Sequence, residues 1–122
     1  MGVRDRGAAT TTRAVPPAIV VRCAEDAAAV LRDVLAGVEE EGVPVRVELV
    51  PGGDARDAAT LAFAAARASS LDVGVGIDRE GAGCVQHAKR PEDRPALTGP
   101  RERARLLGHN AARLVTGIPV KT

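Results

Sequence analysis

Short apolar runs alternate along this chain with segments in which apolar residues recur every three or four positions. The runs at 18–22, 45–50 and 71–77 have the length and the branched side chains typical of strands. The segments that separate them have the apolar spacing of amphipathic helices. Because two parallel strands need a long crossover, which a helix supplies, this alternation predicts a parallel sheet whose connections are helices.

The starts of the first two helices are marked by acidic residues, and the end of the first helix is marked by glycine. Glu25 or Asp26 is expected to open the first helix, and Gly42 supplies the left-handed residue that ends it. After the turn at 51–53, Asp54 is expected to cap the second helix. A helix start can also bind an anion, but an acid there would repel it, so a capped turn is the favoured interpretation.

The second half of the chain adds a hairpin and a last helix. The turn Gly81-Ala82-Gly83 leads the chain into a fourth strand at 84–89, which is predicted to pair antiparallel with the third. A proline-rich loop at 90–99 leads to a helix that begins at Pro100 and ends at Gly117. We therefore expect an α/β fold with three layers, α/β/α. Its sheet should be mostly parallel, with four to five strands plus an antiparallel strand.

The first 15 residues lack apolar periodicity, unlike the rest of the chain. This difference predicts a flexible N-terminal tail over 1–15 and a single α/β domain over 16–122. A chain of 122 residues is long enough for that domain to bury a hydrophobic core.

Phe63 is the only aromatic residue, so the core must consist of Val, Leu, Ile and many Ala. Such small side chains favour close packing, and Gly74 and Gly76 within the third strand are expected to let a helix or another chain approach the sheet. They do not form a nucleotide-binding loop, which needs a third glycine at a helix start. The lack of aromatics excludes base stacking, and a net charge of +1 with interspersed signs argues against a nucleic-acid partner.

Cys23 and Cys84 are the only cysteines and do not form a CxxC pair. This usage predicts buried, reduced thiols in a cytoplasmic protein. No apolar run is long enough to span a membrane, so no membrane association is expected.

One candidate for catalysis lies around the predicted hairpin. His87 and Lys89 share one face of the fourth strand, and Asp78 and Arg79 follow the third strand, so the four are a candidate acid–base cluster. The alternative, which we favour, is an edge strand made polar to resist pairing with other chains.

The last helix carries a second set of polar residues. His109 and Asn110 are expected on its outer side, with no nucleophile at a recognisable spacing. Arg101, Arg105 and Arg113 recur along the same helix. A solvated face is the favoured interpretation of these arginines, and a docking surface for an acidic partner is the alternative.

Three consecutive acids, Glu39, Glu40 and Glu41, end the first helix, where the helix carries a partial negative charge. At about 100° per residue, Glu40 points away from the apolar stripe, Glu39 flanks it and Glu41 tips toward the edge of the core. The acids are compatible with a hydrated, frayed helix end, which the residues alone favour. The alternative is that Glu40 meets a cation brought by another molecule. Mg²⁺ is such a cation, since it often takes only one or two carboxylates from a protein.

Several of these segments occur together, in the same order, in one known family. They are the acidic helix end EEEGVP at 39–44, the strand end GID at 76–78, VQHAK at 85–89 and GHNAARLVTGIP at 108–119. Over about residues 17–120 the sequence resembles the small (beta) subunit of diol/glycerol dehydratase reactivases, which is related to the medium subunit of the B12-dependent dehydratase.

The resemblance implies a chaperone subunit without catalytic or cofactor-binding residues of its own. Its partner would be a large, actin-like ATPase subunit that holds Mg²⁺ and ATP or ADP, in an α2β2 assembly. By exchange with the medium subunit of an adenosylcobalamin-dependent dehydratase, the assembly would release damaged cobalamin. The resemblance also maps the glutamate that reaches the Mg²⁺ of the large subunit onto Glu40.

Two alternatives stay open at this point. One is a medium subunit of a B12-dependent dehydratase, and the other is a stand-alone small-molecule-binding α/β domain that uses His87, Lys89 and Asp78. The sequence does not distinguish a diol target from a glycerol target, nor does it place the protein inside or outside a bacterial microcompartment. Homodimer formation by the isolated chain, and the roles of the tail, His87 and Lys89, are also open.

Overall fold

The computed structural model describes residues 16–55 and 57–122, so the predicted tail at 1–15 lies outside the described part. The elements follow one another in the predicted alternation. In chain order they are β3 (Ile19–Ala24), α1 (Ala28–Glu40), β4 (Val45–Val50), the 3₁₀ turn η1 (Gly52–Asp54), α2 (Ala58–Ala68), β5 (Val73–Ile77), β6 (Gly83–His87), β7 (Leu97–Gly99), the 3₁₀ turn η2 (Arg101–Arg103) and α3 (Ala104–Thr116).

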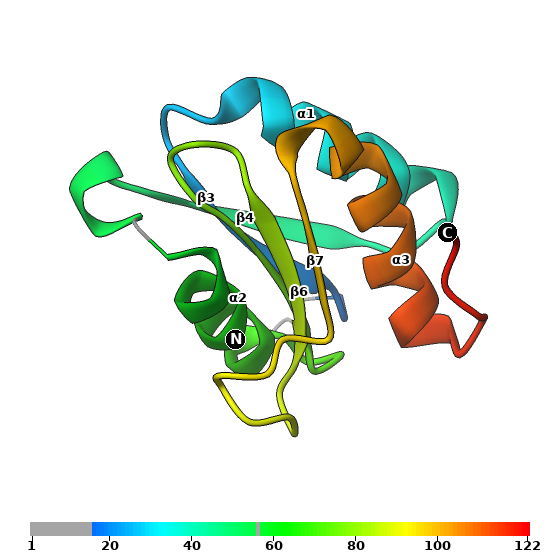
Figure 1. The fold of residues 1–122 in the computed structure, drawn as a ribbon. Coiled ribbons are helices and arrows are strands. Elements are labelled where there is room, and N and C mark those ends of the chain that lie inside the picture. The colour runs from blue at the N-terminus through cyan, green and yellow to red at the C-terminus, as the bar shows by residue number, and fades with distance from the viewer. Residues whose placement is uncertain (1–15, 56) are drawn as a thin grey trace, which may run out of the picture.

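The strands form one five-stranded sheet in the order β4-β3-β5-β6-β7. β3 pairs in parallel with β4 and β5, whereas β6 pairs antiparallel with both β5 and β7. Helix α2 covers one face of the sheet, and α1 and α3 lie together on the other face (Figure 1). The predicted three-layer α/β fold is confirmed. Among the strands, the prediction missed β7, a strand of three residues within the loop at 90–99. Because β7 pairs with β6, the strand that carries His87 is not an edge strand, contrary to the favoured prediction.

Helix α2 packs directly on the backbone of β5. A Cβ atom added at Gly74 would lie 2.1 Å from the nitrogen of Ala66, and one added at Gly76 would lie 2.2 Å from the carbonyl oxygen of Ala58. Both distances are far below van der Waals contact, so only glycine fits at these positions. The close approach of a helix explains the two glycines, as the sequence predicted.

Glycines also bring α1 and α3 into backbone contact. A Cβ atom at Gly37 of α1 would lie 2.1 Å from the carbonyl oxygen of Arg105, and one at Gly108 of α3 would lie 2.1 Å from that of Val34. The two helices therefore cross where neither has a side chain. This crossing decides which residues at the end of α1 face α3.

Two helix starts differ from the predictions. α1 begins at Ala28 without a side-chain cap, because the turn that precedes it is closed by the backbone hydrogen bond from Ala27 N–H to the carbonyl of Ala24. α2 is capped by Asp57, whose carboxylate accepts a hydrogen bond from the N–H of Ala59 at 3.1 Å. Asp54, the predicted cap, instead belongs to the η1 turn.

The last helix also begins later than predicted, since residues 101–103 after Pro100 form η2 and α3 starts at Ala104. The predicted helix ends are confirmed. Gly42 and Gly117 have φ values of 78° and 77°, in the left-handed region that ends helices.

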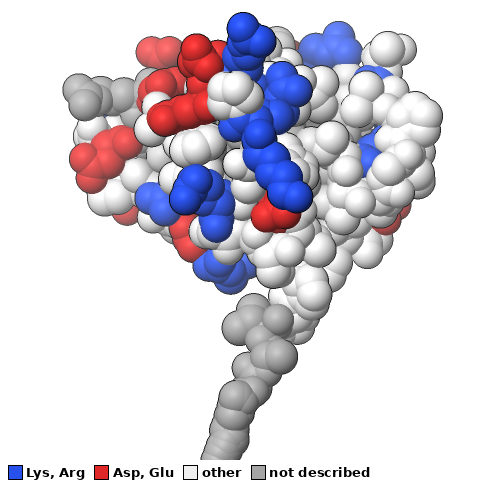
Figure 2. All heavy atoms as spheres, turned by 90° about the horizontal axis from the view of Figure 1, so that it is seen from below, with Lys and Arg blue, Asp and Glu red and all other residues white. Residues whose placement is uncertain are grey.

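Both cysteines, Cys23 and Cys84, are buried and free, as predicted. Burial raises the pKa of each thiol to about 11, so both stay protonated near neutral pH. None of the helices in the described part of the chain has the length and apolar character needed to cross a bilayer. On the face shown in Figure 2, acidic and basic side chains lie side by side, in keeping with a net charge of +1.

Candidate functional site

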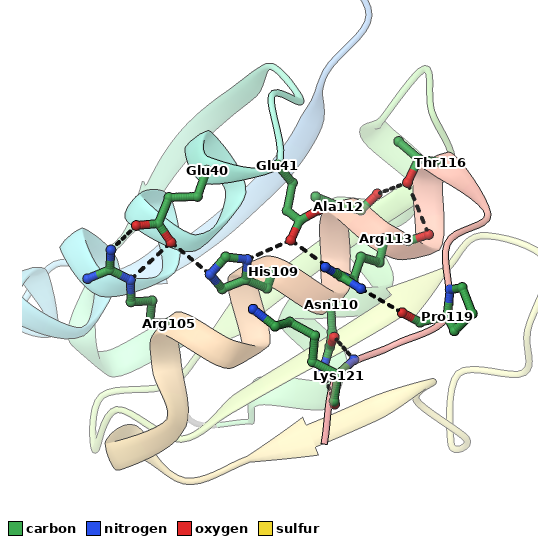
Figure 3. A network of polar contacts seen from close by, with 10 residues as sticks. All are labelled: Glu40, Glu41, Arg105, His109, Asn110, Ala112, Arg113, Thr116, Pro119 and Lys121. Atoms are coloured by element: carbon green, nitrogen blue, oxygen red, sulfur yellow. Dashed lines mark hydrogen bonds and ion pairs between the residues drawn. The ribbon is translucent and has the colours of Figure 1, made fainter.

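The acidic end of α1 lies against the middle of α3 (Figure 3). Glu40 and Glu41 face Arg105, His109 and Arg113, which are spaced four residues apart on α3. Residues four apart on a helix lie on one face, so the three basic side chains form a row along α3. We call these five residues the acid–base row.

Glu40 is bound by two members of the row but stays open to solvent. The Nε of Arg105 donates to Oε1 of Glu40 at 3.1 Å, and the Arg105 Nη2 pairs with Oε2. The Nε2 atom of His109 lies 2.7 Å from Oε1. The Glu40 side chain is nevertheless 41% exposed. Its carboxylate is therefore held in place and still accessible to another molecule.

Glu41 is bound more deeply. Its Oε2 atom lies 2.7 Å from Nδ1 of His109 and accepts a hydrogen bond from Nε of Arg113 at 3.0 Å. Only 13% of its side chain is exposed. The hydrogen bonds from His109 and then from Arg113 lower the pKa of Glu41 below its ordinary value. Glu41 thus anchors the end of α1 to α3.

His109 joins the two carboxylates, because each of its ring nitrogens lies 2.7 Å from a different glutamate. Carboxylate oxygens accept hydrogen bonds and, when ionised, cannot donate them. Both contacts are hydrogen bonds only when both ring nitrogens carry a proton, that is, when His109 is a cation. With Arg105 and Arg113, His109 then offsets the negative charge that the acids and the helix end place here.

Asn110, next to His109, fastens the C-terminal segment to α3. Its Nδ2 donates to the carbonyl of Lys121 at 3.0 Å, and its Oδ1 accepts from the N–H of Lys121 at 2.7 Å. Arg113 adds a hydrogen bond from Nη1 to the carbonyl of Pro119 at 3.1 Å. Arg113 therefore connects the acid–base row to the end of the chain.

The structure corrects the predicted orientation of α3. His109 and Asn110 were expected on its outer side, but His109 is only 13% exposed and faces α1, and Asn110 is buried against the C-terminal segment. Arg101 and Arg105 are exposed, as the favoured prediction of a solvated face expects. Arg105 nevertheless pairs with Glu40, and the less exposed Arg113 pairs with Glu41. The reason is that α3 has three neighbours, namely the sheet, α1 and the C-terminal segment. The apolar stripe of α3 indicates only the side that faces the sheet, and it does not indicate the contacts with α1 and with the C-terminal segment.

The predicted acid–base cluster around the hairpin is not assembled. In the antiparallel pair β5–β6, His87 lies opposite Val73, whereas Asp78 follows the other end of β5, beside Gly83. His87 accepts a hydrogen bond from the N–H of Lys89 at 3.1 Å, and the Asp78 carboxylate accepts two from backbone N–H groups of its own turn. Each side chain therefore stabilises a turn at a different end of the hairpin.

Within the described residues, no group of three or more His, Cys, Asp or Glu is arranged to hold a metal ion. Glu40 offers a single exposed carboxylate, which is the kind of hard oxygen ligand that Mg²⁺ prefers. The chemistry of this donor fits a magnesium ion whose other ligands come from elsewhere. Since the carboxylate is already placed by Arg105 and His109, it would lose little conformational freedom on meeting such an ion.

Comparisons with known proteins agree on one family. A family model described as "Dehydratase medium subunit" matches residues 16–121. The propanediol dehydratase-reactivating factor small subunit of Salmonella typhimurium is 39% identical over 109 residues, which cover 86% of this chain and 90% of that protein. The diol dehydratase-reactivating factor small subunit of Klebsiella michiganensis is 38% identical, with 86% and 84% covered.

Two solved structures have the same fold. A chain of a glycerol dehydratase reactivase superimposes with a TM-score of 0.80 and 34% identity, covering 88% of this chain and 98% of that one. A chain from the structure of a diol dehydratase-reactivating factor complexed with ADP and Mg²⁺ gives a TM-score of 0.78 and 36% identity, covering 88% of this chain and all of the other.

Proposed function

Because the chain belongs to the dehydratase medium-subunit family, as a small subunit of diol/glycerol dehydratase-reactivating factors, we propose that it acts as the non-catalytic subunit of such a factor. In this proposal it binds a large ATPase subunit in an α2β2 assembly. It exchanges with the medium subunit of the target dehydratase, and damaged cobalamin is released. The likeness to that medium subunit, on which an exchange would depend, is supported by the family model that matches residues 16–121.

Glu40 is the proposed contact to the nucleotide site of the large subunit. The observation that carries this assignment is the exposed carboxylate at the end of α1, aimed away from the core and prearranged by Arg105 and His109. In the proposal it supplies one oxygen to the Mg²⁺ that the large subunit holds with ATP or ADP. A related factor was solved with ADP and Mg²⁺, which is consistent with a metal and nucleotide in the partner.

The assignment is tested by calorimetric binding of this chain to the large subunit loaded with Mg²⁺ and ADP. Glu40→Gln keeps the shape of the side chain and removes its charge, so affinity should fall about 10- to 100-fold, the range for loss of a charge-assisted contact. Glu39→Gln is the matched control, because Glu39 is exposed at the same helix end and forms no ion pair within the described residues. Chelation of Mg²⁺ should weaken the wild type and leave Glu40→Gln unchanged. Equal affinities of wild type and Glu40→Gln would refute the role of Glu40.

The two alternatives are less well supported. The relatives are named as reactivating-factor small subunits and match over 84–90% of their length, which does not favour a dehydratase medium subunit. A stand-alone small-molecule-binding domain that uses His87, Lys89 and Asp78 would need these side chains together, and His87 and Asp78 lie at opposite ends of the hairpin. The proposal further treats residues 16–122 as one domain and the protein as cytoplasmic, in keeping with its two buried, protonated thiols.

A further inference from the structure

The strand β4 forms one edge of the sheet (Figure 1). The order of its apolar and charged residues is complementary to that of a second, antiparallel copy of the strand. Its residues 45–49 are Val, Arg, Val, Glu and Leu, so apolar side chains alternate with one base and one acid placed symmetrically about Val47. Two of the exposed large hydrophobic residues of the described chain lie here, with Val47 36% and Leu49 59% exposed. An edge with exposed apolar side chains is a surface on which another strand can pair.

On its outer side, β4 has backbone N–H and C=O groups that do not pair with β3 and can pair with another strand. At its two ends, the carbonyls of Pro44 and Val50 accept hydrogen bonds from the N–H groups of Ile19 and Glu25 at 3.0 Å. Since backbone groups alternate in direction along a strand, the even-numbered residues face β3 and the odd-numbered ones face outward. The residues with outward N–H and C=O groups are therefore Val45, Val47 and Leu49.

A second copy of β4, turned by a two-fold rotation and centred on Val47, satisfies these groups. Val47 then lies opposite Val47 of the other copy as a hydrogen-bonded pair, and Val45 lies opposite Leu49. Arg46 lies opposite Glu48 of the second copy. It does so in the non-hydrogen-bonded position, where side chains of antiparallel strands come closest. The dimer thus contains two such Arg–Glu pairs and a continuous apolar row on the opposite face.

The charges of Arg46 and Glu48 favour this register over the registers that are shifted by two residues. A shift of two residues in one direction places Arg46 opposite Arg46, and a shift in the other direction places Glu48 opposite Glu48. Like charges directly opposite one another are destabilising. Within one copy, Arg46 donates to Glu48 at 2.6 Å and Arg22 donates to Glu48 at 3.0 Å, so the charges are already ordered on this face. An antiparallel copy of the same strand places an opposite charge at both positions.

We propose that the free chain forms a two-fold homodimer through antiparallel pairing of β4, which joins the five-stranded sheets of two copies into one. The inference does not depend on the proposed function, because Glu40 and the rest of the acid–base row take no part in the pairing. The partner is identified by the chemistry of residues 45–49 alone.

The first test is sedimentation velocity of the isolated full chain from about 1 μM to about 1 mM, the range in which weak dimers form. Wild type should convert from monomer to dimer with rising concentration. Val47→Pro removes an outward N–H group and leaves the bonds to β3 intact, as prolines on strand edges do. This variant should self-associate at least tenfold more weakly, with circular dichroism to show that it is folded. A wild type that stays monomeric throughout, or a folded Val47→Pro that dimerises like wild type, would overturn the proposal.

The second test checks the register. Arg46→Glu and Glu48→Arg should each be monomeric alone, because each places like charges opposite one another. An equimolar mixture should dimerise, because acid then meets base at both positions. Glu92→Arg is the matched control, since it reverses an exposed charge in the loop beside the other edge of the sheet and should dimerise like wild type. Folded single variants that dimerise like wild type, or whose mixture stays monomeric, would overturn the register.

Discussion

Replacement of Gly108 by alanine tests whether α1 and α3 touch backbone to backbone, the contact that places the acid–base row. The added Cβ atom would lie 2.1 Å from the carbonyl oxygen of Val34 and 3.1 Å from the nitrogen of Val38. Contacts of 2.1 Å do not occur, so the helices would have to separate by about 1 Å. Such overpacking costs typically about 1–3 kcal/mol.

The same substitution also has a favourable effect, since alanine is a better helix former than glycine by about 1 kcal/mol. We expect the steric cost to exceed this gain, because the obstructing atoms belong to the α1 backbone and not to a movable side chain. With backbone atoms in the way, the steric cost is expected in the upper half of that range, at about 2–3 kcal/mol. The free energy of unfolding should then fall by about 1–2 kcal/mol, which lowers Tm by about 4–9 °C in a domain of this size.

The assay is thermal and urea unfolding followed by circular dichroism. Gly53→Ala is the matched control, because no atom lies within 4 Å of a Cβ atom added there. This control should leave Tm unchanged or slightly raised, as expected for a glycine replaced without strain. A Gly108→Ala protein with a Tm equal to or above that of wild type would show that the helices are not in contact at this point.

Two further predictions concern single side chains. Asp57→Ala removes the cap of α2 and should lower the free energy of unfolding by about 1 kcal/mol, whereas Asp54→Ala should have a smaller effect on the urea midpoint. The pKa of Glu41 is lowered in the folded protein, so its contribution to stability is present above the unfolded value of 4.5 and is lost as pH falls through the folded value. The urea midpoint of wild type should therefore fall below about pH 4.5 more steeply than that of Glu41→Gln, and identical pH profiles would contradict this account.

The spacing of apolar residues alone predicted most of the fold. A helix of average length repeats its apolar residues every three or four positions, and a strand shows a short apolar run or alternation. The spacing failed to predict elements that are too short to show it, and it failed where contacts with another segment determine where a helix begins. β7 has only three residues, too few to show alternation. Asp54 and Asp57 are both good capping residues, and only the η1 turn determines that Asp57 stands at the start of α2.

The candidate site was predicted only in part. The exposure of Glu40 followed from its position opposite the apolar stripe, since that depends on α1 alone. The partners of Glu40 were missed, because the orientation of His109 depends on the contact between two helices. A signal was present in Gly108, since a glycine inside a helix often marks a close helix–helix contact. The basic residues that flank it at spacings of three to five could have been matched to the acids of α1.

The acid–base row changes the explanation of the three acids at the end of α1. The sequence suggested either a frayed, hydrated helix end or a carboxylate awaiting an external cation. The structure shows that cations of α3 already bind Glu40 and Glu41, while Gly42 closes the helix. Glu40 and Glu41 are therefore compensated by basic side chains of the same chain, whereas Glu39 is exposed to solvent. Because Glu41 is the more buried anchor, loss of the Glu40 charge should leave the helix end attached to α3. For that reason the binding of Glu40→Gln to the large subunit can be measured on a folded protein, and a loss of affinity can be assigned to the carboxylate itself.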